Sequence, residues 1–385
     1  MRSSVTVSGG GIIGNYIASR LTSNNIESLV VEKSDGNNNQ SENIRTLTLN
    51  PYSKKLLDDI GIKIPCAEIK TIKVFEGEGS GKIDFKAEEI NEDNLSYVVF
   101  FNELQNLLQE EVLEKTLFKS EIRKITKKDS EDISEVLISN DKTIETKFIA
   151  GCDGRNSKVA KLAEYSEMTG DYNQTAITFT AKCYLEDKHA AYQIFSDKGI
   201  FAIMPLPSNK DDSTHTIVWS VDNEKLVNLN IEQYVDEYMS YFEGKISSKI
   251  NVNSSILSFK LFNHHFKNYV SGSTVLIGDA AHSIHPLAGQ GINLGFADAD
   301  AFCEEIENGF EKSINIDQRL VLKRYEVRRK NTNLIMLKSM DFFVNLFNSD
   351  NLYIKLLRNI GLSRVNKAQF LKKFFISHAS GKNKI

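Results

Sequence analysis

A glycine pattern near the start of the chain constrains its fold more than any other feature. Gly9, Gly11 and Gly14 follow a short apolar segment, residues 4–8, and begin an amphipathic segment that extends over residues 12–21. A second apolar segment follows within 30 residues. This spacing predicts a strand, a tight turn, a helix and a second strand, which together form a βαβ nucleotide-binding unit.

The three glycines of this GxGxxG pattern have different expected roles. The first permits the tight turn, the second lets a pyrophosphate approach the backbone, and the third lets the helix pack closely on the strand. Glu32 ends the second predicted strand, "SLVVE", and can accept a hydrogen bond from a ribose hydroxyl. An acid at this position favours NAD or FAD over NADP. We also expect Ile13, inside the turn, to contact the cofactor.

A second glycine-rich segment, "VLIGDAAHSIHPLAGQGINLG" over residues 275–295, follows a predicted strand. Glycine at this density indicates a backbone that lies against a ligand, and an extended FAD would reach this segment whereas a simple NAD dehydrogenase has no need of it. Asp279 is either a cofactor contact or a helix N-cap. The helix from about Ile292 should point its positive end at the cofactor. The cofactor contacts expected here are Asp279, Pro286, Gly289, Gln290, Gly291, Ile292 and Asn293.

Three ordered motifs give the chain a family resemblance. The GxGxxG pattern, "FIAGCDGRNSKVAKL" (residues 148–162) and the segment over residues 275–295 resemble the signatures of group A flavoprotein monooxygenases related to para-hydroxybenzoate hydroxylase. The run "HPLAGQGINLG", with "MDFFVNLFNSDN" and "FFISHASG" near the C-terminus, is similar to the ubiquinone-biosynthesis hydroxylases within that group. The resemblance covers almost the whole chain.

The resemblance assigns roles to individual residues. It implies that Asp279 bonds the ribityl chain and that Arg45 lies by the flavin and the pyrophosphate. Asp153 and Gly154 correspond to a motif used for both FAD and NAD(P)H, although Asp153 alone also reads as an ordinary turn aspartate. Ala160 stands where relatives commonly carry Arg, which weakens the expectation for NAD(P)H more than that for FAD.

The resemblance also implies a reaction. NAD(P)H would reduce FAD, and a C4a-hydroperoxyflavin would hydroxylate the ring of a polyprenyl phenol in ubiquinone biosynthesis. No catalytic side chain is expected, because the flavin carries the chemistry. The alternatives are another aromatic substrate, or a non-catalytic flavoprotein that scaffolds a quinone-biosynthesis complex. A flavin halogenase is disfavoured because Trp219 is the only tryptophan.

The middle of the chain should supply the substrate pocket. Between about residues 172 and 266, strand-like runs alternate with turn signals, which predicts an antiparallel sheet over the flavin. The alternative for each apolar residue in these strands is a position in the hydrophobic core of the sheet. The pocket residues we propose from sequence are Phe201, Met204, Leu206, Trp219 and His285.

The expected fold class is mixed α/β, with a Rossmann-like FAD-binding domain, an interleaved antiparallel β-sheet domain and C-terminal helices. The FAD-binding domain is expected over residues 1–70, 98–165 and 269–310. The sheet domain is expected over residues 71–97 and 166–268, and a helical region with a basic tail over residues 311–385.

Composition narrows the partners. A formal net charge of −4 argues against nucleic acid. Four scattered cysteines suggest neither disulfides nor zinc, and His282 and His285 are too few for a metal site, so we expect no metal. The N-terminus lacks the apolar core of an export signal, and no run is long enough for a membrane span. We therefore expect a cytoplasmic protein.

The C-terminal tail differs in charge from the rest of the chain. Residues 351–385 contain eight Lys or Arg and no acid, interleaved with apolar side chains. This pattern is typical of a basic amphipathic surface that binds anionic lipid, which would place the protein peripherally on the inner membrane. The alternative is a pair of helices that packs on the domain.

Overall fold

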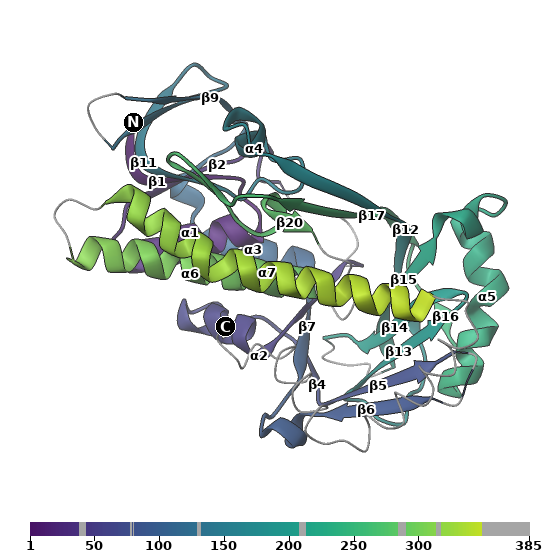
Figure 1. Cartoon of the computed structure of the whole chain (residues 1–385). Helices are drawn as coiled ribbons and strands as arrows, with labels where there is room; N and C mark the ends of the chain where they lie inside the picture. Colours follow the sequence, from purple (N-terminus) through teal and green to yellow (C-terminus); the bar gives the residue numbers. More distant parts are fainter. Residues whose placement is uncertain are drawn as a thin grey trace.

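The computed structural model describes residues 1–37, 44–77, 79, 81–128, 132–207, 213–283, 290–312 and 317–348. It has the expected mixed α/β fold, with two large sheets and one small sheet (Figure 1). The tail over residues 349–385 and the loop over residues 284–289 lie outside the described part, so the predictions for them remain predictions.

The first sheet carries the nucleotide-binding unit. Its central strands are parallel, in the order β19-β11-β1-β2-β8, so their carboxyl ends meet at one edge. Ser8, the last residue of β1, pairs with both Gly151 and Val31 at that edge. The strands are β1 (Arg2–Ser8), β2 (Ser28–Val31), β8 (Thr116–Leu117), β9 (Ile122–Lys127), β10 (Ser134–Ile138), β11 (Thr143–Gly151), β18 (Val270–Ser271) and β19 (Thr274–Leu276).

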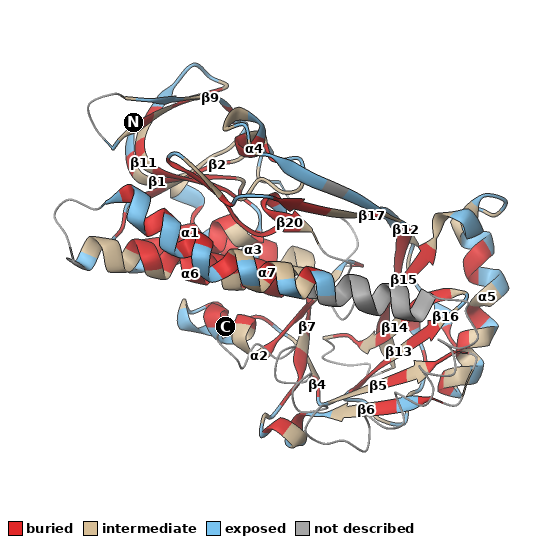
Figure 2. Cartoon of the chain, in the orientation of Figure 1, coloured by how far each residue is buried: buried red, intermediate tan, exposed pale blue. Residues whose placement is uncertain are grey.

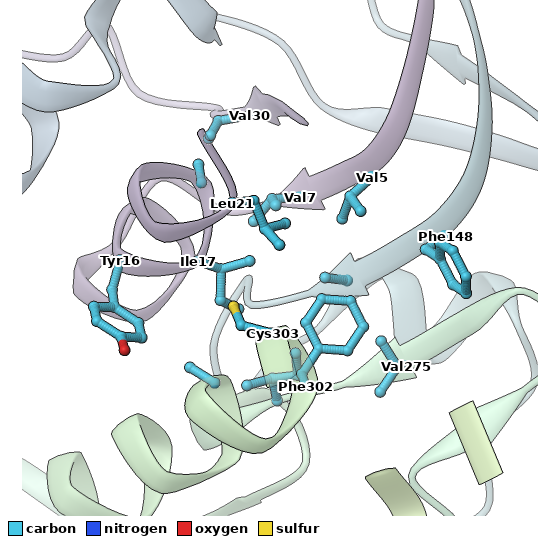
Figure 3. Packing of buried hydrophobic residues seen from close by; sticks show 14 of the residues in the cluster. Val5, Val7, Tyr16, Ile17, Leu21, Val30, Phe148, Val275, Phe302 and Cys303 are labelled. Carbon is cyan, nitrogen blue, oxygen red and sulfur yellow. The ribbon is translucent and has the colours of Figure 1, made fainter. Parts of the chain in front are cut away.

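Helices pack on this sheet and form the larger hydrophobic core. Ile17 and Leu21 of α1 meet Val7 of β1 and Phe302 and Cys303 of α6 (Figure 3). Each of these five side chains is fully buried. The helices are α1 (Ile12–Ser23), α3 (Phe101–Glu111), α4 (Lys158–Leu162), α6 (Gln290–Lys312) and α7 (Gln318–Asn348), of which α6 and α7 lie side by side (Figure 1).

The second sheet contains the predicted antiparallel strands, with strand order β20-β17-β12-β15-β14-β13-β5-β6, and among its described strands only the pair β13 and β5 is parallel. Helix α5 (Ile231–Ile246) covers one face and begins at Asn230, which shares a capping box with Gln233. The strands are β5 (Thr71–Glu76), β6 (Lys82–Lys86), β12 (Glu167–Lys182), β13 (Ala190–Ser196), β14 (Gly199–Pro205), β15 (Thr214–Asp222), β16 (Asn251–Val252), β17 (Leu257–Phe266) and β20 (His282–Ser283).

Strand β12 connects the two parts of the fold. Its first residues are exposed, whereas residues 174–181 are buried in the second sheet (Figure 2). The pairing of β12 with β17 shifts register between Asp171 and Gln174. Because β20 pairs with β17, the segment that follows Asp279 returns to the edge of the second sheet.

The third sheet has three strands, in the order β3-β7-β4. β7 begins inside the segment 71–97 that we assigned to the sheet domain, but it pairs with strands from the first 70 residues. The elements are β3 (Thr46–Leu49), α2 (Pro51–Asp59), β4 (Ala67–Ile69) and β7 (Ser96–Phe100), with 3-10 turns at Ala87–Ile90, Leu113–Lys115, Asn223–Leu226 and Gly278–Ala280.

Candidate cofactor and substrate site

The glycine turn after β1 has the contacts that its three expected roles require. Gly9 has a φ of +104°, and a Cβ there would lie 2.6 Å from the carbonyl oxygen of Cys152. A Cβ on Gly14 would lie 2.0 Å from the carbonyl oxygen of Gly9, so only glycine lets α1 approach this closely. A Cβ on Gly11 would meet nothing within 4 Å, because Gly11 faces open cavity.

Glu32 holds the turn from the second strand. Its carboxylate accepts hydrogen bonds from the backbone N–H groups of Gly10, at 2.6 Å, and Ser34, at 2.7 Å. The carbonyl oxygen of Gly10 in turn accepts from the side chains of Asn15, at 3.0 Å, and Gln105, at 2.6 Å. Glu32 also lines the cavity, where an adenosine ribose would meet it.

Asp153 and Gly154 follow β11 and line the same cavity. One oxygen of Asp153 accepts from the N–H groups of Lys158, at 2.7 Å, and Val159, at 3.2 Å, and thereby holds the start of α4. The other oxygen is buried and has no hydrogen-bond partner among the described residues. One oxygen of Asp153 therefore acts as an ordinary turn aspartate does, while the second remains available to a ligand.

Asp279 and Arg45 both line the cavity. The side chains of Asp279 and Arg45 are exposed to the cavity, but the surrounding protein still removes part of their water. This desolvation raises the pKa of Asp279 against the charges of His282 and Arg45, and it lowers the pKa of Arg45 against the charge of Asp279. The Arg45 guanidinium carbon lies 4.2 Å from the centre of the Phe101 ring. The two charges therefore stabilise one another in a partly desolvated space.

The start of α6 reaches the cavity through Gly291 and Ile292. Asn293 is buried instead: its amide donates to the carbonyl oxygen of Thr48 and accepts from the N–H of Asn50, each at 2.8 Å. Asn293 therefore ties α6 to the third sheet and does not line the cavity. Ile13 lines the cavity and packs against Gly295. Gln290 begins α6, but its side chain lies outside the described part, as do His285, Pro286 and Gly289.

The predicted substrate residues divide between the two faces of the second sheet. Met204 lines the cavity. Phe201 and Trp219 do not, and these two pocket assignments are corrected: both are fully buried on the opposite face, against Tyr234 and Phe242 of α5. Side chains alternate between faces along a strand, so residues 201 and 204 of β14 cannot face the same side.

Leu206 also lies away from the cavity and is corrected in the same way. It follows β14 and packs with Ile69, Val98 and Ala191 in a small core between the second and third sheets. The cavity face of the second sheet is instead made by residues that sequence reasoning missed: Thr178, Gln193, Ile200, Ala202, Val218 and Ser220. The sequence pattern that could have identified them is the period-two alternation, because alternate residues of each strand face the same side.

A buried polar network holds the turn that carries Asp279. Asp298 of α6 accepts from the backbone N–H of Gly278 at 3.2 Å, and its other oxygen lies 2.7 Å from Nε of Arg329. Nε2 of His282 lies 2.7 Å from Asp298, and the Asn333 amide donates to Asp298 at 2.9 Å. All five residues are buried. Among the described residues, no three His, Cys, Asp or Glu side chains gather as a metal site.

The cavity that these residues line has a volume of about 740 Å³ and joins the glycine turns of the first sheet to the face of the second. The residues present fit a bound dinucleotide flavin. Gly11 leaves room beside the α1 N-terminus for a pyrophosphate, and the free oxygen of Asp153 and the carboxylate of Asp279 offer acceptors for hydroxyl groups. The fold and the cavity together are those of a dinucleotide-binding flavoprotein whose cofactor cavity extends onto a β-sheet.

Comparisons with known proteins identify the family. Residues 2–329 match the family described as FAD binding domain, so the chain belongs to that family, and FAD is confirmed as its cofactor. It is 27% identical over 390 residues to 3-demethoxyubiquinol 3-hydroxylase of Escherichia coli (strain K12), with 98% of each chain covered. The resemblance to ubiquinone-biosynthesis hydroxylases is thereby confirmed.

A eukaryotic relative agrees with this assignment, and a solved structure shares the fold. The mitochondrial ubiquinone biosynthesis monooxygenase COQ6 of Dictyostelium discoideum is 26% identical over 456 residues, covering 98% of this chain and 91% of the relative. The crystal structure of P. aeruginosa PqsL in complex with 2-aminobenzoylacetate has a TM-score of 0.79 at 16% identity, covering 94% of this chain and 100% of that chain. This likeness supports the fold.

Proposed function

We propose that this chain is a FAD-dependent monooxygenase that hydroxylates the aromatic ring of a prenylated phenol in ubiquinone biosynthesis, with NAD(P)H and O2 as co-substrates. One observation carries the proposal: a cavity joins the FAD-binding turns to a sheet face that combines apolar side chains with a few uncharged polar ones. The full-length similarity to ubiquinone-biosynthesis hydroxylases supports the substrate class.

Bound FAD supplies the oxygen-transfer chemistry in enzymes of this kind. The chain's own residues bind and orient it. The N-terminal amides of α1 at Gly11 and Ile12 would hold the pyrophosphate, and Glu32 and Asp279 would accept from its hydroxyl groups. Gly291 and Ile292 place the N-terminus of α6 at the cavity, where it would stabilise negative charge.

The second sheet positions the substrate and excludes water. Ile200, Ala202 and Val218 provide a flat apolar surface on which an aromatic ring can lie. Excluding water protects a reactive oxidant from hydrolysis and strengthens the hydrogen bonds that orient the ring. Because only one GxGxxG unit is present in the sequence, NAD(P)H would bind transiently at the same cavity, near Asp153 and Gly154.

An apolar prenylated substrate also needs a route from the membrane. None of the helices in the described ranges is long and apolar enough to cross a bilayer. We propose that the basic tail over residues 351–385 binds an anionic membrane surface, or that a quinone-biosynthesis complex delivers the substrate. The tail itself lies outside the described residues.

Stopped-flow absorbance tests the proposed function. Holoenzyme is mixed with NADH or NADPH, with and without 2-geranylphenol, a short-chain prenylated phenol added from a detergent solution. We expect the phenol to accelerate flavin reduction and, under O2, to gain one oxygen atom by mass spectrometry. Bound FAD that NAD(P)H never reduces would contradict an enzyme and favour the scaffold. Reduction without an oxygenated product would point to another aromatic substrate.

Asp279→Ala provides a second test, of the cofactor site alone. Charge-assisted hydrogen bonds are worth roughly 1.5–3 kcal/mol, so FAD affinity should fall about ten- to hundredfold. Asp236→Ala, an exposed acid on α5, is the matched control. Equal flavin content in both variants after desalting would show that Asp279 is a structural residue of its turn.

A further inference from the structure

One row of side chains crosses the cavity face of the second sheet. Backbone pairing places Gln193 of β13 opposite Ala202 of β14, Ala202 opposite Val218 of β15, and Val218 opposite Thr178 of β12. All four line the cavity. Helix α5 packs on the other face of this sheet (Figure 1). The alternate residues of these strands pack against α5 and are buried, so the row lies on the face that is left for a ligand.

Gln193 is the long polar side chain of this row. Ala202 and Val218 are apolar, and the Thr178 hydroxyl already donates to the carbonyl oxygen of Ile217 at 2.9 Å. The carboxamide of Gln193 is half-buried and has no hydrogen-bond partner among the described residues. On the β5 side, its direct neighbour is the buried Val74. Within the described part of the chain, the donor and the acceptor of the Gln193 carboxamide are therefore both free to meet a ligand in the cavity.

The chemistry of the row limits the ligand group that it can meet. The row holds no charge, whereas Arg45, Asp279 and Glu32 lie among the residues that would hold the cofactor. A ring lying on Ala202 and Val218 would displace the water that solvates the Gln193 amide. A buried unpaired polar group is unfavourable, so binding would be weakened unless the ring supplies an oxygen or an N–H group to pair with this amide.

We propose that Gln193 determines substrate specificity by hydrogen-bonding an oxygen substituent of the substrate ring. The amide accepts from a phenol hydroxyl or donates to a methoxy or carbonyl oxygen, and it selects against rings that lack the oxygen. The inference rests on the proposed function, because it takes the ligand to be an oxygen-bearing aromatic ring.

The test compares two probes that differ in one oxygen, 2-geranylphenol and geranylbenzene. Each is titrated into holoenzyme, and its dissociation constant is read from the change in flavin absorbance. The wild type should prefer the phenol by about tenfold, which corresponds to one net hydrogen bond. In Gln193→Leu the preference should fall to near unity, with FAD content unchanged.

Two further variants keep the test decisive. Thr126→Val, which changes an exposed threonine of β9 outside the cavity, is the control and should retain the preference of the wild type. Gln193→Met, unbranched like glutamine, replaces Gln193→Leu if that variant loses FAD.

The outcomes separate the two proposals. A tenfold preference that survives in the Gln193 variants overturns the role of Gln193 but leaves the proposed function standing, because the phenol still binds beside the flavin. A wild type whose flavin responds to neither probe overturns the proposed function and, with it, the inference.

Discussion

Nε2 of His282 lies 2.7 Å from an oxygen of Asp298, and both side chains are buried beneath the turn that presents Asp279 to the cavity. The other oxygen of Asp298 lies 2.7 Å from Nε of Arg329. The Asp298 carboxylate of α6 therefore connects β20, which contains His282, with α7, which contains Arg329. The charges of His282 and Arg329 overcome the effect of burial and hold the pKa of Asp298 well below its usual range.

Asp298→Asn should destabilise the protein strongly. The substitution leaves Arg329 buried without its counter-ion, and breaking a buried pair in this way costs about 3–5 kcal/mol. Urea denaturation followed by circular dichroism measures the free energy of unfolding. Asp141→Asn, which removes an exposed partner 3.9 Å from Arg123, is the control and should change little. Equal midpoints for the two variants would contradict a stabilising role for the network.

Stability should also decrease as the pH falls from about 6.5 to about 4. Burial lowers the pKa of both His264 and His265 to about 4 in the folded protein, whereas an unfolded histidine titrates near 6.5. Between these values the unfolded chain binds more protons, so protonation favours unfolding. The pKa of Asp298 is lowered from 3.8, so its contribution is lost only at still lower pH.

Urea midpoints at about pH 7.5 and about pH 5 measure this dependence. His264→Phe should reduce the loss between the two pH values, because the buried ring no longer titrates. His189→Gln is the control, since His189 is exposed and solvent reaches its ring in both states. A loss of stability that is the same in His264→Phe as in the wild type would contradict the assignment.

The glycine turn was predictable from sequence because its requirements are local. The helix expected over residues 12–21 extends over Ile12–Ser23, and the strand expected over residues 28–32 over Ser28–Val31. Both follow from periodicity and from a turn that only glycine can make. The partners of Gly10 were not predictable, since Gln105 comes from α3, 95 residues away along the chain.

The substrate face was predicted less well, for a physical reason. Phe201 and Trp219 are large and aromatic, which suits a pocket and a sheet core equally. Pairing places them directly opposite each other, so they face the same side, towards α5. Knowing that α5 covers that side requires the tertiary structure. The network around Asp298 was missed because its members lie 16 to 35 residues from Asp298 along the chain.

Two glycine substitutions should separate cofactor binding from folding. Gly11→Ala places a methyl group in open cavity, so the FAD-free protein should keep its stability while FAD affinity falls about ten- to hundredfold through lost backbone contacts. Gly14→Ala should instead destabilise the fold by about 1–3 kcal/mol, since its Cβ would overlap the Gly9 carbonyl oxygen.

Fluorescence titration with FAD and thermal melts of the FAD-free protein measure both effects. Gly244→Ala, on α5 with nothing within 4 Å of its Cβ, is the matched control: it should leave FAD affinity unchanged and should not destabilise the fold, because alanine is the better helix former. Full FAD affinity in Gly11→Ala would show that the pyrophosphate does not approach this turn.

The last prediction concerns the tail and follows from its charge. Residues 351–385 contain eight basic side chains and no acid, and each basic side chain near an anionic leaflet is worth about 1 kcal/mol. Wild-type protein should therefore float with vesicles that contain anionic lipid, and salt should release it because screening weakens the attraction. Replacing Lys367, Lys372 and Lys373 by Glu should abolish flotation without changing FAD content.

A matched variant tests whether flotation depends on the net charge of the whole protein and not on the tail. Lys63, Lys124 and Lys127 are exposed on other parts of the chain, and their replacement by Glu changes the net charge by the same amount. This variant should float like the wild type. If both triple variants lose flotation equally, the attraction comes from overall charge. If the wild type fails to float even at low salt, a protein partner must deliver the substrate, because a prenylated phenol is too apolar to diffuse freely through water.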